Sequence, residues 1–487
     1  MSPFITKPMT TLSRMQAMLP GSQLLHIAPE DAKTLSISRV SSDSRKVQAG
    51  ELFISLVGDR FDAHDFLDDV ESAGASAALV SSLDKCPKHL PAVCVPDVRK
   101  SLGQLAQAWR AQFSIPVALV TGSNGKTTVK EMIASIFKGA VGLDQVLVTQ
   151  GNLNNDIGLP LTLLRMRESD RLAVIELGMN HPGETAQLAA IAQANIAVIN
   201  NAQREHQEFM ATVEAVAIEH ATALSALPIN GVAVFPADSE FTSLWRQASV
   251  DRKVIDFAFA TDHQVISASV TGSSLSNGKV EIQTEQGVIE VRLNTLGDHN
   301  IRNALAASAV ALGAGLSLEN IKTGLESFSP VNGRMQSKYL SAQRTLIDDT
   351  YNANPDSVCA AIDSLKRSGN ISWLVLGDMG EVGDQGPAFH EEVGAYAAEC
   401  GIAQFFALGE QSHFAAQGFN KIKNERALTS HAFHFMDIDQ LLEVMSTQLG
   451  ALPNSQDQQL DILVKGSRFM RMERVVQALL EEAKTCS

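Results

Sequence analysis

The segment from Thr121 to Thr128 constrains the fold of this chain more than any other part of its sequence. It follows the apolar run Val117 to Val120, which is typical of a buried strand, and it precedes the helical run Val129 to Ala134. Its two glycines allow a tight turn whose backbone N–H groups face an anion, and the start of the helix adds a positive partial charge. The sequence therefore predicts a phosphate-binding loop between a strand and a helix.

The residue types of this loop fit the binding of ATP and Mg²⁺. Lys126 is expected to reach the outer phosphates, and the Thr127 hydroxyl is a suitable ligand for Mg²⁺. The full motif would place a glycine where the chain has Val120, so the match is to the shorter form GxxGK[ST]. The alternative interpretation is a plain glycine turn. The ATP-binding residues predicted here are Gly122, Ser123, Asn124, Gly125, Lys126, Thr127 and Thr128.

Apolar runs separated by helical stretches predict an α/β protein, and 487 residues suit roughly three domains. A connector at 113–116 and a segment rich in turn residues at 327–333 divide the chain into domains 1–113, 114–329 and 330–487. We expect a smaller N-terminal α/β domain, a central domain with a mostly parallel sheet around the phosphate loop, and a C-terminal Rossmann-like α/β domain. Alternation between Val265 and Leu293 predicts an antiparallel appendage, followed by a helix from Asn300 to Leu312.

Charge and composition exclude several classes of protein. A net charge of −15, without a stripe of lysine and arginine, argues against nucleic acid as a partner. The longest apolar stretch, Leu305 to Leu316, is shorter than the ~18 residues that a membrane span needs, so no membrane insertion is expected. The N-terminus lacks the apolar core of a secretory signal, which predicts a cytoplasmic protein. Five scattered cysteines favour neither a disulfide framework nor a zinc site.

Four segments together make the chain resemble the Mur ligases of peptidoglycan synthesis. They are the phosphate loop and the segments 151–160 (GNLNNDIGLP), 176–179 (ELGM) and 297–306 (GDHNIRNALA). Within the family, the resemblance is strongest to members that add D-alanyl-D-alanine to UDP-N-acetylmuramoyl-tripeptide, because of the segments 43–45, 58–66, 348–355 and 465–468. The signature Asp-Asn-Pro-Arg of the tripeptide-forming members is absent from the third domain.

The resemblance implies an ATP- and Mg²⁺-dependent ligase that activates a carboxylate as an acyl phosphate and joins it to an amine. It also implies that the first domain holds the UDP moiety, the second ATP, and the third the amine substrate. We expect the enzyme to act as a monomer. The implied substrate-binding residues are Ser42, Asp43, Ser44, Arg45, Asn154, Asn155, Tyr351, Asn352, Asn354, Lys465, Ser467 and Arg468.

The chemistry of these substrate residues can also be interpreted independently of the resemblance. The segment 43–45 offers a carboxylate, a hydroxyl and a guanidinium, which suit a uridine and its diphosphate. If the resemblance is set aside, a solvated turn explains these residues equally well. Either Lys465 or Arg468 could hold the carboxylate of the dipeptide.

The metal ligands are predicted partly from the residues and partly from the resemblance. Glu176 follows a buried strand, where a carboxylate oxygen suits Mg²⁺. By resemblance, His206 is the ligand of a second Mg²⁺. The family usually carries a carbamylated lysine about a dozen residues further on, but residues 217–221 (AIEHA) contain none. The hypothesis is that Glu219 supplies the carboxylate instead.

Residues beyond the phosphate loop complete the predicted ATP site. By resemblance, His299, Asn300 and Asn303 border the adenine, although ordinary helix capping is the alternative. Arg334 and Asp349 are implied to meet the γ-phosphate and the ribose from the third domain, so that closure of a hinge completes the site. The predicted catalytic residues are Lys126, His206 and Arg334.

Two other functions remain open on the sequence alone. A folylpolyglutamate-synthase-like ligase shares the phosphate loop and the three-part layout, and a UDP-binding first domain argues against it. A non-ligating ATPase or molecular switch would hydrolyse nucleotide without joining substrates. The segment 420–423 (NKIK) lacks the aspartate of a guanine-binding signature.

Overall fold

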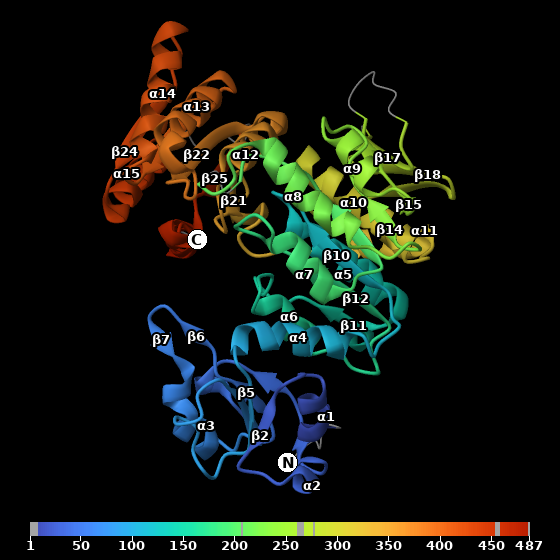
Figure 1. The fold of residues 1–487 in the computed structure, drawn as a ribbon. Coiled ribbons are helices and arrows are strands. Elements are labelled where there is room, and N and C mark those ends of the chain that lie inside the picture. Colours follow the sequence, from blue (N-terminus) through green and yellow to red (C-terminus); the bar gives the residue numbers. More distant parts are fainter. Residues whose placement is uncertain (1–7, 206–207, 261–266, 276–277, 453–457, 486–487) are drawn as a thin grey trace.

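The computed structural model describes residues 8–205, 208–260, 267–275, 278–452 and 458–485 (Figure 1). The chain forms an α/β protein whose described residues contain three larger sheets of five, six and six strands, one four-stranded sheet and two two-stranded sheets. In Figure 1 the first part of the chain lies at the bottom, the central part at the right and the last part at the upper left. Across the described residues, every helix is too short or too polar to serve as a membrane span.

The first part is a small five-stranded mixed sheet with short helices. Its strand order is β2-β9-β8-β5-β4, and β2 is antiparallel to β9 while the other pairs are parallel. The elements are β1 (Thr10–Thr11), α1 (Leu12–Ala17), β2 (Gln23–Leu25), α2 (Pro29–Ala32), β3 (Ser36–Ile37), β4 (Val40–Ser41), β5 (Leu52–Ile54), β6 (Val57–Gly58), β7 (Phe61–Asp62), α3 (Leu67–Ser72), β8 (Ala77–Val80) and β9 (Ala92–Cys94).

Helix α4 (Val98–Arg110) joins this part to the central one. Its N-terminus is capped by the Asp97 side chain, which accepts from the Lys100 N–H. Its apolar face packs on α6 and α7 of the central part, and Trp109 Nε1 donates to the Met166 carbonyl oxygen at 3.2 Å. The predicted boundary after residue 113 therefore follows a helix whose core is shared by both parts, and that boundary stays a prediction.

The central sheet, predicted to be mostly parallel, is entirely parallel in the order β11-β12-β10-β13-β14-β15. Side chains of β10 alternate between two cores: Leu119 packs with α4 and α7, whereas Ala118 and Val120 pack under α5 and α10. Burial on both faces explains the unbroken apolar run. The elements are β10 (Val117–Thr121), α5 (Lys126–Val141), β11 (Val146–Val148), α6 (Gly158–Leu163), β12 (Leu172–Glu176), α7 (Glu184–Ala192), β13 (Ile196–Ile199), α8 (Val213–Ser225), β14 (Val232–Val234), α9 (Thr242–Ala248), β15 (Lys253–Val254), α10 (Asp298–Gly313) and α11 (Leu318–Ser327).

The predicted antiparallel appendage is confirmed for three strands, β17 (Val270–Ser274), β18 (Val280–Thr284) and β19 (Gly287–Val291). A fourth strand, β16 (Phe257–Phe259), pairs with β17 in parallel, which the alternation did not indicate. Residues 276–277, which fall within the predicted appendage, lie outside the described residues. Helix α10 starts at Asp298, two residues earlier than predicted.

The last part is a six-stranded sheet in the order β20-β21-β25-β22-β23-β24. Its strands are parallel except β20, an antiparallel edge strand that the sequence did not indicate. The carboxyl ends of β21 and β25 are adjacent and turn toward the central part (Figure 1). The elements are β20 (Gln336–Ser341), β21 (Arg344–Asp349), α12 (Pro355–Ser368), β22 (Ile371–Gly377), α13 (Gly386–Glu399), β23 (Gln404–Leu408), α14 (Ser412–Glu425), β24 (His431–Phe435), α15 (Ile438–Ala451), β25 (Leu460–Lys465) and α16 (Glu473–Thr485).

Candidate active site

A cavity of about 820 Å³ lies between the central and last sheets. Its walls come from the loops that follow β10, β12 and β13 on one side, and from the loops after β21 and β22 and the last residue of β25, Lys465, on the other. Parallel sheets present their ligand-binding loops at the carboxyl ends of the strands. The cavity therefore joins the binding edges of two sheets.

The phosphate loop is held in shape by its glycines. Gly122 and Gly125 have positive φ values of 128° and 78°, and Gly125 caps α5 in the left-handed region. A Cβ atom on Gly125 would lie 2.5 Å from Asn303 Oδ1 and 2.6 Å from Asn200 Nδ2. Only glycine fits this close approach, so the loop was correctly predicted as a tight turn between strand and helix.

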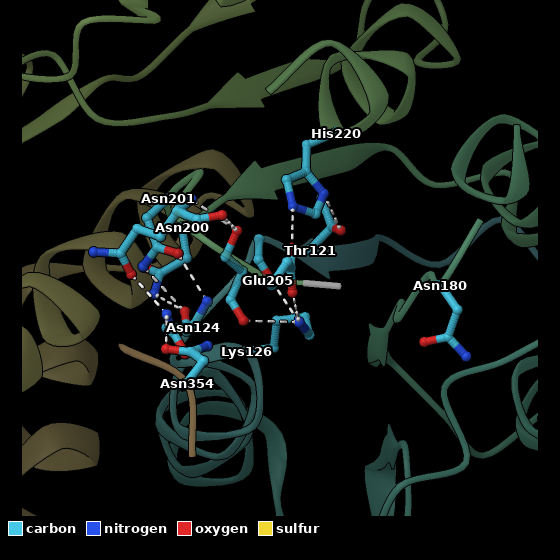
Figure 2. A network of polar contacts seen from close by, with 12 residues as sticks. Thr121, Asn124, Lys126, Asn180, Asn200, Asn201, Glu205, His220 and Asn354 are labelled. Carbon is cyan, nitrogen blue, oxygen red and sulfur yellow. Dashed lines mark hydrogen bonds and ion pairs between the residues drawn. The ribbon is translucent and has the colours of Figure 1, made fainter. Parts of the chain in front are cut away.

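The ammonium group of Lys126 lies over the loop (Figure 2). Its Nζ donates to the carbonyl oxygens of Gly122 at 2.6 Å and Ser123 at 3.1 Å, and lies 3.4 Å from Glu205 Oε2. The side chain is therefore held at the anion-binding face of the loop, where phosphate oxygens compete for the same donor.

The Thr127 hydroxyl and the Glu176 carboxylate form an oxygen-rich corner that fits Mg²⁺. Thr127 Oγ1 donates to Glu176 Oε1 at 3.2 Å, and Asn154 Nδ2 donates to the same oxygen at 2.7 Å. The other oxygen, Oε2, is buried without a hydrogen-bond donor and lies 3.8 Å from the Lys130 ammonium. An orphaned carboxylate oxygen beside a hydroxyl is a suitable donor set for a hard cation.

A complete cage for a metal ion is not required here. In the part of the chain that the structure describes, no cluster of three or more His, Cys, Asp or Glu side chains is arranged as a metal site. Mg²⁺ usually keeps several waters and takes oxygens from the phosphates, so that one or two protein ligands suffice. Thr127 and Glu176 fit that pattern.

Asparagines tie the phosphate loop to the neighbouring strand and to the last sheet (Figure 2). Asn200 Nδ2 and Asn201 Nδ2 donate to the Asn124 carbonyl oxygen at 2.8 and 3.1 Å. Asn354 Nδ2 donates to Asn124 Oδ1 at 2.9 Å, while Asn354 Oδ1 caps α12 by accepting from the Ser357 N–H. The start of α12 is thereby attached directly to the loop.

Arg204 makes a second connection between the central and last parts. Its guanidinium pairs with Asp356 at 2.6 Å and Glu392 at 2.8 Å and lies 5.2 Å from the centre of the Phe389 ring. The ion pair with Glu392, together with the one with Asp356, raises the pKa of Arg204. Neither Arg204 nor Asp356 was predicted, because the partners are 152 residues apart in the sequence.

Arg334 brings a positive charge from beyond the second predicted linker. Its Nη2 donates to Thr127 Oγ1 at 3.0 Å, and its guanidinium lies 4.1 Å from the centre of the Tyr351 ring. Asp349 lines the same cavity and accepts from Lys465 Nζ at 2.6 Å and from the Met335 N–H at 3.1 Å. The structure therefore brings these predicted residues next to the phosphate loop.

The side chains expected near adenine form one hydrogen-bonded row in the cavity wall. Asn303 Oδ1 accepts from Asn200 Nδ2 at 2.8 Å, and Asn303 Nδ2 donates to Asn300 Oδ1 at 2.9 Å. His299 lies beside them, and burial lowers its pKa. A neutral imidazole and two amides suit an uncharged base, and this role stays a prediction.

The predicted substrate residues are only partly brought together. Asn154, Asn155, Tyr351, Asn352, Asn354 and Lys465 line the cavity. Ser467 does not, because its hydroxyl joins the Gly380 N–H to the Ala353 carbonyl oxygen, and the exposed Arg468 pairs with Glu473.

The predicted UDP-binding loop lies away from this cavity. Ser42, Asp43, Ser44 and Arg45 do not line it. Arg45 and Asp43 form an exposed ion pair, and this hydrogen bond lowers the pKa of Asp43 to about 2. The role of these four residues in binding UDP stays a prediction.

The predicted metal role of Glu219 needs correction. Its two carboxylate oxygens accept from the Gly183 and Thr185 N–H groups at 2.9 and 2.8 Å, which stabilises the start of α7, and the residue does not line the cavity. A carboxylate saturated by backbone donors is not available to a cation in the cavity. His206, the other predicted ligand of the second cation, lies outside the described residues.

Comparison with known proteins agrees with this arrangement. The family model described as "Mur ligase middle domain" matches residues 120–311, and the one described as "Mur ligase, glutamate ligase domain" matches residues 333–468. A curated relative in Escherichia coli (strain K12), named UDP-N-acetylmuramoyl-tripeptide–D-alanyl-D-alanine ligase, is 39% identical over 93% of this chain and 95% of its own. A relative of the same name in Haemophilus influenzae is 37% identical over 95% of this chain and 98% of its own.

A solved structure is similar over nearly the whole chain. The crystal structure of MurF from Acinetobacter baumannii superposes with a TM-score of 0.86 at 32% sequence identity. The match covers 98% of this chain and 99% of that one. The similarity therefore extends to the first part of the chain, which neither family model covers.

Proposed function

The chain belongs to the Mur ligase family, and on this premise we propose that the cavity between its central and last sheets is the active site. The enzyme is an ATP-dependent ligase that adds D-alanyl-D-alanine to UDP-N-acetylmuramoyl-tripeptide, a step of peptidoglycan synthesis, with Mg²⁺ as cofactor. The observation that supports this site best is the contact of Arg334 with Thr127 and of Asn354 with Asn124, because two residues from the last part of the chain meet the loop that we assign to ATP.

The reaction needs activation because a carboxylate oxygen is a poor leaving group. The terminal carboxylate of the tripeptide attacks the γ-phosphorus of ATP, the bond to the β-phosphate oxygen breaks, and ADP leaves. The amino group of D-alanyl-D-alanine then attacks the acyl phosphate carbonyl, inorganic phosphate leaves and the amine loses a proton. No protein nucleophile is needed.

The basic residues of the site act on the phosphates. Lys126 from the central part and Arg334 from the last part both line the cavity and offset negative charge on the transferring group. Thr127 and Glu176 would hold the cofactor, since one offers a hydroxyl and the other an orphaned carboxylate oxygen. When bound, Mg²⁺ supplies positive charge to the phosphate oxygens.

The loops of the last part receive the amine substrate in this proposal. Tyr351, Asn352 and Lys465 line the same cavity as the phosphate loop. Lys465 is almost fully buried and donates to Asp349 Oδ2 and to the Asn352 carbonyl oxygen. Of the two candidates for the dipeptide carboxylate, the exposed Arg468 lies outside the cavity, which favours Lys465.

The remaining substrate assignments belong to the same proposal. His299, Asn300 and Asn303 border the adenine, Asp349 the ribose, and Ser42 to Arg45 the UDP moiety. The three predicted domains, 1–113, 114–329 and 330–487, then hold UDP, ATP and the amine substrate. We also propose that the enzyme is cytoplasmic and acts as a monomer. Light scattering of the purified chain at assay concentrations tests the oligomeric state.

Release of phosphate tests this function against its alternatives. The ligase releases phosphate from ATP only when UDP-N-acetylmuramoyl-tripeptide and D-alanyl-D-alanine are both present. A non-ligating ATPase releases phosphate without them, and a folylpolyglutamate-synthase-like ligase responds to glutamate and a folate instead. Phosphate release that ignores either substrate would contradict the proposal.

A further inference from the structure

A buried carboxylate and imidazole, Glu205 and His220, stand next to the phosphate loop. His220 Nε2 lies 3.0 Å from Glu205 Oε1 and donates to it, while the Thr121 hydroxyl lies 3.0 Å from His220 Nδ1 (Figure 2). The exposed fractions are 6% for Glu205 and 0% for both His220 and Thr121. These three side chains therefore form a hydrogen-bonded chain that runs from Thr121 at the end of β10, through His220 on α8, to Glu205 in the cavity wall.

This arrangement fixes which oxygen of Glu205 faces the cavity. His220 occupies Oε1, and Oε2 lies 3.4 Å from Lys126 Nζ, on the side of the phosphates. Glu205 lines the cavity whereas His220 does not. The imidazole thus holds a carboxylate whose second oxygen is directed at the phosphate-binding face.

Most of the other basic side chains that line the cavity already form ion pairs with acidic residues. Among the lysines and arginines that line it in the described part of the chain, four are each paired with an aspartate: Arg99 with Asp156, Arg204 with Asp356, Arg302 with Asp238, and Lys465 with Asp349. Lys126 and Arg334 remain to face the triphosphate together with the carboxylates of Glu176 and Glu205. With one divalent cation at Thr127 and Glu176, the negative charge of the triphosphate and the two glutamates still exceeds the positive charge in the cavity. A buried carboxylate such as Glu205 that faces phosphate without a cation between them opposes the binding of ATP.

We propose that Glu205 is an oxygen ligand of a second divalent cation in the nucleotide complex, and that His220 is the residue that positions it. The inference rests on the proposed function, since ATP bound at the phosphate loop brings the phosphate oxygens that the cation also needs. Lys126 turns from Glu205 to the phosphates, and the cation takes its place at Oε2. This assigns to Glu205 the carboxylate role that was predicted for Glu219.

Manganese titration of the full chain tests the assignment. Free Mn²⁺ is measured by electron paramagnetic resonance in the presence of the non-hydrolysable β,γ-imido analogue of ATP. The wild-type chain should bind two Mn²⁺ ions, and Glu205→Gln should bind one with unchanged affinity while the second is lost. His220→Gln should weaken the second ion by about 10- to 100-fold, the usual effect of removing a group that orients a ligand.

Glu219→Gln is the matched control, because it removes a buried carboxylate from the same helix as His220 without touching the cavity. It should lower the thermal stability and leave both Mn²⁺ ions bound. Glu205→Asp keeps a carboxylate and should recover part of the second ion's affinity, which separates ligation from a loss of folding.

Two results would overturn the assignment. One is a wild-type chain that binds a single Mn²⁺ with the analogue. The other is Glu205→Gln with an unchanged Mn²⁺ titration or with tighter analogue binding, which would make Glu205 only a partner of Lys126. Failure of the ligase function is seen separately, as a wild-type chain that binds both ions and forms no product.

Discussion

Arg334 and Thr127 are 207 residues apart, yet the Arg334 guanidinium donates to the Thr127 hydroxyl at 3.0 Å. The same hydroxyl donates to Glu176, so one atom connects the last part of the chain to the predicted Mg²⁺ site. We therefore expect docking of the last sheet and binding of Mg²⁺ at Thr127 and Glu176 to be coupled. This coupling gives the ligase a way to assemble its charges only when both parts are in place.

Arg334→Ala should slow the chemical step more than it weakens ATP binding. Loss of one charge that faces the transferring phosphoryl group costs about 100- to 1,000-fold in kcat, by analogy with removal of an oxyanion-stabilising donor. Steady-state kinetics in all three substrates measure the effect. Arg426→Ala, which breaks an exposed ion pair with Glu399 on the last part, is the control and should leave kcat unchanged. An equal loss in both variants would contradict the role of Arg334.

Arg204 and Asp356 should behave as one unit that docks the last part on the central part. We expect Arg204→Ala and Asp356→Ala each to lower kcat/KM, and the double variant to lose less than the sum. A coupling of about 0.5–3 kcal/mol is usual for contacting residues. A double-mutant cycle on kcat/KM for D-alanyl-D-alanine measures it. Fully additive effects would show that the contact does not support the active arrangement.

Gly125→Ala should damage the phosphate loop through its backbone. The left-handed conformation costs a residue with a Cβ about 1–2 kcal/mol, and that atom would also meet Asn303 and Asn200. We expect a lower thermal unfolding midpoint and weaker ATP binding by calorimetry. Gly139→Ala in α5 is the control, because its Cβ meets nothing within 4 Å and a helix interior favours alanine by about 0.5–1 kcal/mol. Similar losses in both variants would contradict this account.

His390 should make the last part less stable in mild acid. Its Nε2 accepts from the Met379 N–H at 2.9 Å and its Nδ1 donates to the Gly386 carbonyl oxygen at 2.7 Å, so the folded state needs the neutral ring. Burial lowers its pKa below the ordinary value of about 6.5. As the pH falls below that value the unfolded chain gains a proton first, and the free energy of unfolding decreases.

Thermal unfolding at pH 7.5 and 5.5 tests this sign. The wild-type midpoint should fall more on acidification than that of His390→Gln, which keeps a donor and an acceptor without a titrating group. The other histidines are present in both the wild type and the variant, so their contribution to the fall in the unfolding midpoint cancels in the comparison. Equal falls would show that another group controls the acid sensitivity.

Local patterns were sufficient to predict the scaffold of the site. The strand before Thr121, the glycine turn and the helix after Gly125 are set by neighbouring residues, and the structure has all three. Glu176 was predicted for a similar reason, because it ends a buried strand whose carboxyl end faces the cavity. These features need no knowledge of distant contacts.

Contacts between distant segments could not be predicted in the same way. Glu219 and His220 are adjacent on α8, and their directions differ because Glu219 meets the start of α7 while His220 meets β10 and Glu205. Without the packing of that helix, the sequence does not say which of the two neighbours packs toward the phosphate loop. The signal available in the sequence for Glu205 was a glutamate in the polar segment that follows the apolar run Ile196 to Ile199.

The transfer of oxygen tests the central claim most directly. UDP-N-acetylmuramoyl-tripeptide labelled with ¹⁸O on both oxygens of its terminal carboxylate is joined to D-alanyl-D-alanine by the full chain with ATP and Mg²⁺. Activation as an acyl phosphate requires one labelled oxygen in the released phosphate and the other in the new amide carbonyl, as seen by mass spectrometry. Unlabelled phosphate, or consumption of ATP without the labelled pentapeptide, would contradict the account.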